Sequence, residues 1–125
     1  MLVVDDNAAF RGLAVRILVG WGHEVIEAGS VADALSLAAE FKPHAVVADI
    51  GLPDGDGFAL TQKLIALPVA PRVVLISTDS DAGNRSAAGR AGAHGFFPKD
   101  ELLKGGMREL IADQWTAPGG RDREL

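Results

Sequence analysis

Short runs rich in Val, Ile, Leu and Phe alternate along this chain with longer segments of helical character. Five such runs occur, each of strand length, at residues 2–4, 24–26, 45–48, 73–76 and 95–97. The first, third and fourth runs are continuously apolar and contain β-branched residues, which is typical of parallel strands buried on both faces. The alternation therefore predicts an α/β fold.

The segments between the runs carry helix signals. Asn7 is expected to cap a helix over residues 8–20, and Ser30 one over residues 31–41 that ends before Pro43. Three further helices are expected over residues 58–67, 82–91 and 101–115, of which the fourth in the chain is weakened by two glycines. The side chains expected to face the core are Phe10, Leu13, Ala14, Ile17, Leu18, Leu35, Ala38, Ala39, Leu60, Leu64, Leu67, Leu103, Met107, Leu110 and Ile111.

Strict alternation of strand and helix implies a parallel sheet with helices on both faces. With five such units, the prediction is a flavodoxin-like, doubly wound sheet of five strands in the order 2-1-3-4-5, with five helices. The chain of 125 residues is long enough for one such domain, expected at residues 1–115. Residues 116–125 contain Pro118 and a glycine pair, which predicts a flexible tail or the start of a linker.

The charge and cysteine content exclude several classes of function. Lys and Arg number 12 against 17 Asp and Glu, and the net charge of -5 offers no footprint for direct binding of nucleic acid. No cysteine is present, so disulfides and cysteine-based zinc sites are excluded. The apolar run at the N-terminus is too short for a signal peptide or a membrane span. A cytoplasmic location without membrane contact is the expectation.

Polar side chains follow four of the five predicted strands. They are Asp5 and Asp6 after the first, Asp49 after the third, Ser77 and Thr78 after the fourth, and Lys99 after the fifth. Ligands of such sheets bind outside the carboxyl ends of the strands, where the strand order reverses, so these side chains should converge. Three crowded carboxylates would raise one another's pKa unless a cation neutralises them, and an all-oxygen site favours Mg²⁺.

A carboxylate beside Mg²⁺, a lysine and a hydroxyl is equipped to accept a phosphoryl group. With this constellation, the chain resembles the receiver domains of two-component response regulators from residue 2 to about residue 115. The matching segments are Val4-Asp5-Asp6, residues 49–57 from Asp49 to Gly57, Leu75-Ile76-Ser77, and residues 91–99 from Ala91 to Lys99. Each segment alone is weak evidence, but together, in this order and spacing, they are specific.

The resemblance implies a role for each matching residue. Asp49 would be the phosphoacceptor and Lys99 the lysine that binds the phosphoryl group. Asp5 and Asp6 would hold Mg²⁺ together with Asp49 and the backbone carbonyl of Gly51. Ser77, which lies 22 residues before Lys99, would be the switch hydroxyl, and Phe96 the aromatic residue that moves with it.

The resemblance also implies a regulatory switch more than an enzyme, although such domains assist their own phosphorylation and autodephosphorylation. The phosphoryl donor would be a histidine kinase or a phosphotransfer protein. The chain is expected either to dock on a downstream protein target or to belong to a longer regulator with an output domain. Whether phosphorylation drives formation of a homodimer stays open.

Two departures from the family pattern concern the site. Asp100 follows Lys99 where many members have proline, so a cis peptide bond is not expected there. Thr78 is larger than the usual residue, so access to Asp49 is expected to be narrower and the reaction rates to differ. Apart from these departures, Gly51 offers no side chain over an acyl phosphate and Asp79 lies two residues past Ser77, and the hypothesis is that these two positions tune the lifetime of the phosphorylated form.

These residues also have other interpretations. A single Asp after a strand is most often a helix cap, and Asp54, Asp56, Asp79, Asp81 and Asp100 are expected to be caps or solvated loop acids. Haloacid dehalogenase-type phosphatases also use an Asp at a strand end, but they need a second acid at the position of Gly51. The alternative function is a pseudo-receiver that binds proteins without being phosphorylated, against which the complete set of site residues argues.

Overall fold

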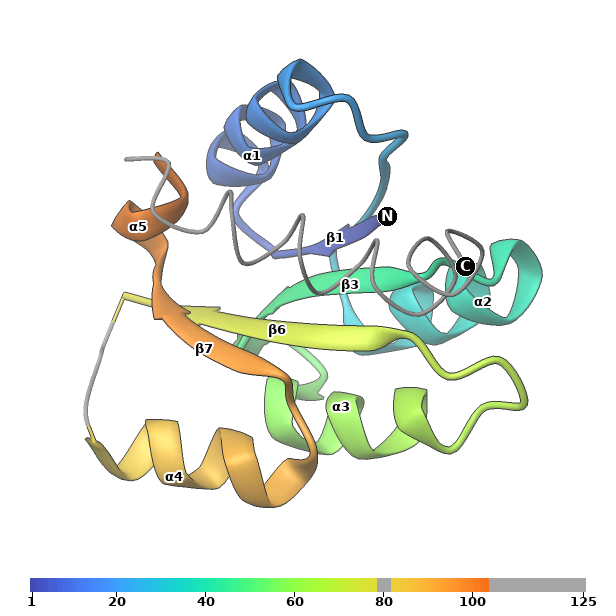
Figure 1. Ribbon diagram of the computed structural model, residues 1–125, viewed down its shortest axis with the longest axis vertical. Helices are drawn as coiled ribbons and strands as arrows, with labels where there is room; N and C mark the ends of the chain where they lie inside the picture. The colour runs from blue at the N-terminus through green and yellow to red at the C-terminus, as the bar shows by residue number, and fades with distance from the viewer. Residues whose placement is uncertain (79–81, 104–125) are drawn as a thin grey trace, which may run out of the picture.

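Five parallel strands form the central sheet of the computed structural model, which describes residues 1–78 and 82–103 (Figure 1). The strands are β1 (Leu2–Val4), β2 (Ile26–Ala28), β3 (Ala45–Asp49), β6 (Arg72–Ser77) and β7 (Gly95–Pro98). Their order across the sheet is β2-β1-β3-β6-β7, and every neighbouring pair is parallel. Counted along the chain within this sheet, the order is 2-1-3-4-5, which confirms the prediction.

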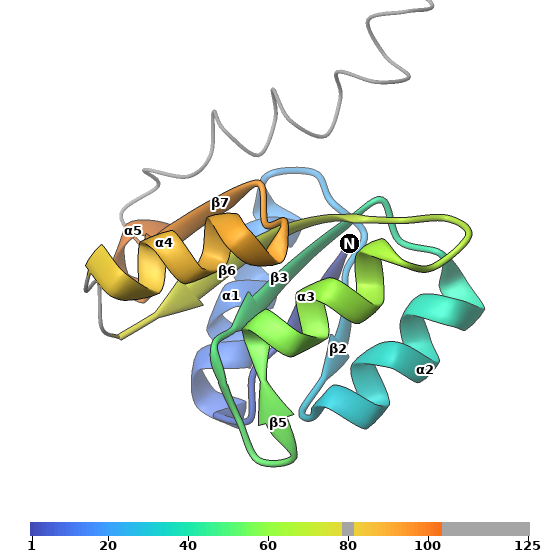
Figure 2. The ribbon, with the colours of Figure 1, turned by 90° about the horizontal axis from the view of Figure 1, so that it is seen from below.

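Among the described residues, five helices accompany the strands. They are α1 (Ala8–Gly20), α2 (Val31–Phe41), α3 (Gly57–Ile65), α4 (Ala82–Ala91) and α5 (Lys99–Leu103). Figure 1 shows α1 on one side of the sheet and α3 and α4 on the other, and Figure 2 shows α2, α3 and α4 covering that second face together. Among the described residues, no helix has both the length and the apolar character needed to cross a membrane.

Side chains of the central strands alternate between two cores, one on each face of the sheet. Toward α1, the buried residues of the core are Val3, Val47, Val74 and Ile76, which pack with Ala14 and Leu18. Toward α2, α3 and α4, the strand residues are Leu2, Val4, Val46, Ala48, Val73, Leu75 and Phe96, which pack with Ala34, Ala38, Leu60, Leu64 and Ala88 among others. Burial on both faces explains why the middle strands are continuously apolar.

Two of the predicted helices, α1 and α2, have the expected bounds because their caps are the expected ones. The Asn7 side chain accepts a hydrogen bond from the backbone N–H of Phe10, and Ser30 accepts one from that of Asp33. Lys42, which precedes Pro43, adopts a left-handed conformation with φ 49° and ends α2. The bounds of α4 also agree with the prediction.

The structure corrects other boundaries. The second strand is Ile26–Ala28 and not residues 24–26, because its pairing with β1 begins at Ile26 opposite Leu2. Helix α3 is Gly57–Ile65 and not residues 58–67, since the side chain of Asp56 caps it and its last turn closes before Pro68. Ala39, which was predicted to face the core, is exposed. The buried face of α2 consists of Val31, Ala34 and Ala38, and Ala39 lies outside this face.

Two features near the carboxyl ends of the strands differ from the prediction or were not foreseen. A short antiparallel hairpin, β4 (Gly51–Leu52) with β5 (Gly55–Asp56), separates β3 from α3. Helix α5 begins at Lys99, two residues before the predicted start at residue 101. The remainder of the predicted helix to residue 115 and the predicted tail at residues 116–125 lie outside the described residues.

Candidate functional site

Three carboxylates meet at the carboxyl ends of two neighbouring strands of the sheet, β1 and β3. Asp49 is the last residue of β3, and Asp5 and Asp6 directly follow β1, the strand beside it. One oxygen from each of the three carboxylates lies within 4.8 Å of the others. Asp5 is buried, Asp49 is partly buried and Asp6 is exposed, so the cluster opens to solvent on the side of Asp6.

Lys99 reaches this cluster from the end of β7. Its Nζ lies 2.7 Å from Oδ2 of Asp5 and 3.3 Å from Oδ2 of Asp49. Burial alone would lower the pKa of Lys99, but the two carboxylates outweigh that effect and raise the pKa above its ordinary value. Lys99 therefore remains a cation at the site over the whole physiological range of pH.

The carboxyl group of Asp49 is held in an unfavourable electrostatic position. Burial, and then the charge of Asp5, raise the pKa of Asp49 above its ordinary value, against the opposing effects of Lys99 and of a hydrogen bond from the Gly51 backbone N–H. A single lysine therefore does not neutralise the acids completely. A site of this kind favours a further cation, and it places a partly desolvated carboxylate where it can act as a nucleophile.

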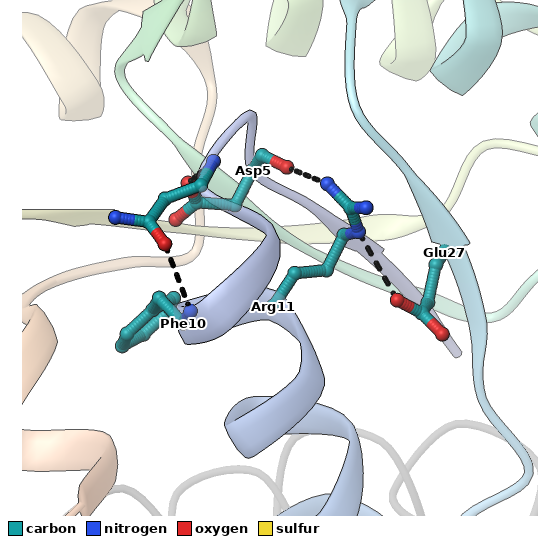
Figure 3. A network of polar contacts seen from close by, with 5 residues as sticks. Asp5, Phe10, Arg11 and Glu27 are labelled. Atoms are coloured by element: carbon teal, nitrogen blue, oxygen red, sulfur yellow. Dashed lines mark hydrogen bonds and ion pairs between the residues drawn. The ribbon is translucent and has the colours of Figure 1, made fainter.

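Asp5 is fixed through its backbone as well as its side chain (Figure 3). The guanidinium group of Arg11 donates a hydrogen bond of 2.6 Å to the Asp5 carbonyl and pairs at 3.0 Å with the carboxylate of Glu27 on β2. Oδ1 of Asp5 accepts a 2.9 Å hydrogen bond from the backbone N–H of Asn7. These contacts hold the Asp5 carboxylate toward the site before any ligand binds.

The loop that follows Asp49 is tied to two helices. The carboxylate of Asp54 accepts hydrogen bonds from the backbone N–H groups of Val31 (2.7 Å) and Ala32 (3.0 Å) at the start of α2. Asp56 caps α3 in the same loop, so both acids are caps, as expected. A Cβ atom added to Gly57 would lie 2.7 Å from the carbonyl oxygen of Asp49, so only glycine lets α3 start this close to the site.

Ser77 ends β6 beside the acidic cluster, and Thr78 follows the strand. A cavity of about 580 Å³ lies next to them, and its lining also includes Phe10, Pro98 and Lys99. Ser77 is 3% exposed, whereas Thr78 is exposed at the surface. The predicted switch hydroxyl and the predicted phosphoryl-binding lysine therefore border the same cavity.

Phe96 lies away from this cavity, in the core beneath α4. It is 4% exposed and packs with the core cluster that includes Leu75 and Ala88. The guanidinium carbon of Arg85 lies 5.6 Å from the centre of its ring, and Arg85 also donates a 3.2 Å hydrogen bond to the Phe96 carbonyl. The structure thus links Phe96 to α4, and shows it in a buried position.

The donor set suits a hard divalent cation. Asp5, Asp6 and Asp49 provide carboxylate oxygens, and Oδ2 of Asp5 is buried with no hydrogen bond of good geometry from any described residue beyond its ion pair with Lys99. An all-oxygen set with an open, solvated side fits Mg²⁺, which retains several of its waters in proteins. Gly51, whose carbonyl was predicted as a further ligand, is exposed at the start of the hairpin.

Sequence patterns did not identify all the residues that shape the site. Arg11 and Arg85 were not singled out, since spacing along a helix does not show which backbone carbonyl a guanidinium reaches. Phe10 was predicted only as a core residue of α1, but Lys99 Nζ lies 4.6 Å from the centre of its ring. The peptide bond after Lys99 is trans, as the absence of proline predicted.

Comparisons with known proteins agree with this fold. The family model of the response regulator receiver domain matches residues 1–110. The chain is 35% identical over 99 residues to the KDP operon transcriptional regulatory protein KdpE of Escherichia coli, a match that covers 79% of this chain and 44% of that protein. The chain spans about half the length of the curated relatives it matches.

Solved structures give the same result. The signal receiver domain of the putative response regulator NarL from Mycobacterium tuberculosis superimposes with a TM-score of 0.79 at 29% identity, over 93% of this chain and 94% of that one. A response regulator from Burkholderia pseudomallei, solved with a phosphorylated aspartic acid, calcium ion and citrate, gives 0.74 at 26% identity, over 90% and 71%. The chain belongs to the response regulator receiver domain family, whose members are regulatory switches in two-component signalling.

Proposed function

We propose that this chain accepts a phosphoryl group on Asp49 and changes conformation in response. The observation that carries the proposal is the position of Lys99, which contacts both Asp5 and Asp49 inside a cluster of three carboxylates. Independent support comes from the similar response regulator of Burkholderia pseudomallei, whose structure contains a phosphorylated aspartic acid and a calcium ion. Residues 1–115 form the receiver domain in this proposal, and residues 116–125 a tail or the start of a linker.

Asp5, Asp6, Asp49 and the carbonyl of Gly51 are the groups that would hold Mg²⁺. The bound cation would supply charge stabilisation for the oxygens of the transferred phosphoryl group. The chain's own contribution is to present the acids in a fixed arrangement, which Arg11 and Asn7 secure at Asp5. Fixed charges of this kind need no reorganisation during the reaction.

The reaction proposed is transfer from a phosphohistidine of a histidine kinase or phosphotransfer protein. A carboxylate oxygen of Asp49 attacks phosphorus, an O–P bond forms and the P–N bond breaks, and the imidazole leaves with the bonding electron pair. Lys99 stands 3.3 Å from the attacking carboxylate and would pair with the phosphoryl oxygens. Hydrolysis of the acyl phosphate by water later restores Asp49, so the chain assists both steps without being a conventional enzyme.

The conformational change would run from Ser77 to Phe96 and α4. Ser77 borders the cavity with Lys99, and its hydroxyl would close onto the phosphoryl group. Phe96, buried on the same sheet beneath Arg85, would then respond together with α4. A switch of this type requires that the phosphoryl group bind one conformation more strongly than the other.

The consequences for other molecules are part of the same proposal. The relatives are transcriptional regulators about twice as long as this chain, so an output domain or a separate protein target would receive the signal. The chain itself, with its net charge of -5, would not bind nucleic acid directly. The proposed place of action is the cytoplasm, and phosphorylation is proposed to promote homodimer formation where the target requires it.

The test is intact-mass measurement after incubation with Mg²⁺ and acetyl phosphate. The wild type is expected to gain one phosphoryl adduct that hydroxylamine removes, because an acyl phosphate reacts with this nucleophile. The Asp49→Asn variant is expected to gain none. A folded wild type that gains no adduct from acetyl phosphate or from a phosphorylated histidine kinase would contradict the proposal and would favour the alternative, a phosphorylation-independent interaction module.

A further inference from the structure

The cation of Lys99 is restrained from a third side by an aromatic ring. Besides its contacts with Asp5 and Asp49, its Nζ lies 4.6 Å from the centre of the Phe10 ring. The side chain of Lys99 is 15% exposed, so this cation–π contact is formed in a largely desolvated position. Such contacts are stronger when water is excluded.

The ring itself is held by the same turn that holds Asp5. Phe10 lies in the first turn of α1, where its backbone N–H donates a 3.0 Å hydrogen bond to the side chain of Asn7. The backbone N–H of Asn7 in turn donates to Oδ1 of Asp5. Phe10 also packs at the edge of the core cluster that contains Ala14 and Leu18, so its ring has little freedom to move away from Lys99.

We propose that Phe10 is a positioning residue for the phosphoryl-binding lysine, and that the face of its ring keeps Lys99 beside Asp49. The proposal rests on the proposed phosphorylation of Asp49. Two carboxylates attract Lys99, and Asp5 is the closer of them. When a cation or a phosphoryl group neutralises these acids, the attraction weakens, while the attraction of the ring persists because it does not depend on their charge.

A ring face is a suitable third contact for this lysine. It accepts no proton, it forms no directional hydrogen bond and it cannot displace a ligand from the carboxylates. It attracts the ammonium group through the quadrupole of the π-system, so Lys99 can turn its hydrogen-bond donors from the acids toward a phosphoryl oxygen without leaving the ring. Phe10 and Lys99 line the same cavity as Ser77, which places this contact on the side where a phosphoryl group would enter.

The experiment measures the rate of phosphorylation by acetyl phosphate at saturating Mg²⁺ for a series of residues at position 10. Site-specific incorporation of mono-, di- and trifluorinated phenylalanine weakens the quadrupole stepwise at nearly constant shape. The rate is expected to fall with each fluorine, and Phe10→Leu is expected to lower it roughly threefold to tenfold. Phe41→Leu, at an exposed position on α2, is the matched control and should leave the rate unchanged.

A double-mutant comparison separates positioning from packing. If Phe10 acts through Lys99, Phe10→Leu should have no further effect on the residual rate of a Lys99→Ala variant. Apparent Mg²⁺ affinity should change by less than about twofold in Phe10→Leu, since the acids are held by other contacts. A rate that is insensitive to fluorination, or that falls equally with and without Lys99, would show that Phe10 only fills space.

The contact has a readout that does not require phosphorylation. The ε-methylene protons of Lys99, assigned by comparison with Lys99→Arg, should resonate upfield from those of other lysines because of the ring current of Phe10, and Phe10→Leu should abolish the shift. If the wild type gains no adduct, the proposed function fails and the positioning role fails with it. If the adduct forms but the shift is absent and the rate does not respond to fluorination, only the role of Phe10 is refuted.

Discussion

The two sides of the site are built in different ways. On the side of β1 and β3, Asp5 is held by Arg11 and Asn7, and the loop after Asp49 is tied to α2 through Asp54. On the side of α4 and β7, the described residues of α4 that are buried are the small Ala88 and Ala91, and Arg85 joins this helix to Phe96.

This difference assigns separate tasks to the two sides. Charges that must stabilise a transferred group need fixed positions, and the acidic side meets that need with hydrogen bonds to backbone atoms. A helix that buries small side chains can shift at a smaller energetic cost. The acidic side is therefore the rigid part of the site, and α4 is the part suited to respond.

Two glycines provide the strongest test of this comparison. Gly57→Ala should destabilise the protein by roughly 1–3 kcal/mol, because the new Cβ would lie 2.7 Å from the Asp49 carbonyl oxygen and 2.9 Å from the Ile50 Cα. Gly89→Ala, in α4, should stabilise it by about 0.5–1 kcal/mol, since nothing lies within 4 Å of the new atom and alanine favours helix. Urea unfolding measures both, and equal effects would contradict the contrast between the two sides.

Substitutions of Arg11 and Arg85 should give the next largest difference in stability between the two sides. Arg11→Met removes a hydrogen bond to the Asp5 carbonyl and should cost roughly 1–2 kcal/mol of stability, together with a severalfold loss of Mg²⁺ affinity. Arg85→Met should cost only about 0.5 kcal/mol, because Arg85 is exposed, and should leave Mg²⁺ affinity unchanged.

Glu27→Gln is the control for Arg11 in the same experiment. The Glu27 side chain is 47% exposed, so its ion pair with Arg11 should be worth less than about 1 kcal/mol. Chemical unfolding and metal titration followed by tryptophan fluorescence measure the three variants. If Glu27→Gln weakens Mg²⁺ binding as much as Arg11→Met does, the hydrogen bond from Arg11 to the Asp5 carbonyl is not the contact that supports Mg²⁺ binding.

The sequence was sufficient to predict the side of the site that is built from strand ends. Asp5, Asp6, Asp49 and Lys99 converge because parallel strands end at one edge of the sheet, and the strand order followed from the alternation of apolar runs and helices. Asn7 and Ser30 were predictable as caps because a cap acts within a few residues.

Contacts between segments distant in the sequence were not predictable in this way. The bond from Asp54 to the start of α2 joins residues 23 positions apart, and the ring of Phe10 meets Lys99 from the opposite end of the chain. The second strand was misplaced by two residues because the most apolar pair in this segment is Val25-Ile26, whereas the residues that pair with β1 include the charged Glu27. Only the register with a neighbouring strand distinguishes these possibilities.

The stabilisation provided by the hydrogen bonds between Asp54 and the start of α2 should depend on pH. Hydrogen bonds from Val31 and Ala32 lower the pKa of Asp54 below its ordinary value of 3.8, so the charged form stabilises the folded state. That stabilisation is fully present above pH 3.8 and is lost as the pH falls through the lowered pKa of the folded state. Asp54→Ala should therefore lower Tm by a few degrees at pH 7, and the difference should disappear in strong acid.

Thermal unfolding across the pH range tests this prediction, with Asp33→Ala as an exposed acid of α2 for comparison. Asp33 lies in the first turn of the same helix, but its carboxylate is not the one that bonds Val31 or Ala32. If the Tm difference between Asp54→Ala and the wild type persists unchanged below the lowered pKa, the link between Asp54 and the start of α2 does not depend on the charge of Asp54.

The smallest expected effect on stability concerns Asp49, whose charge is expected to destabilise the folded state, whereas the charge of Asp54 stabilises it. Burial and the charge of Asp5 raise the pKa of Asp49, so its charged form opposes folding above pH 3.8, and increasingly so as the pH rises through the raised value. Without metal, Asp49→Asn should be slightly more stable than the wild type at pH 7 and equal to it in acid. Saturating Mg²⁺ should reverse the order, because the wild type gains more from binding the cation. The acidic side, which Arg11 and Asp54 anchor, can tolerate this unfavourable charge, whereas the described part of α4 buries only the small side chains of Ala88 and Ala91. If Asp49→Asn were less stable than the wild type in the absence of metal, Lys99 alone would neutralise the cluster and the case for a divalent cation at this site would weaken.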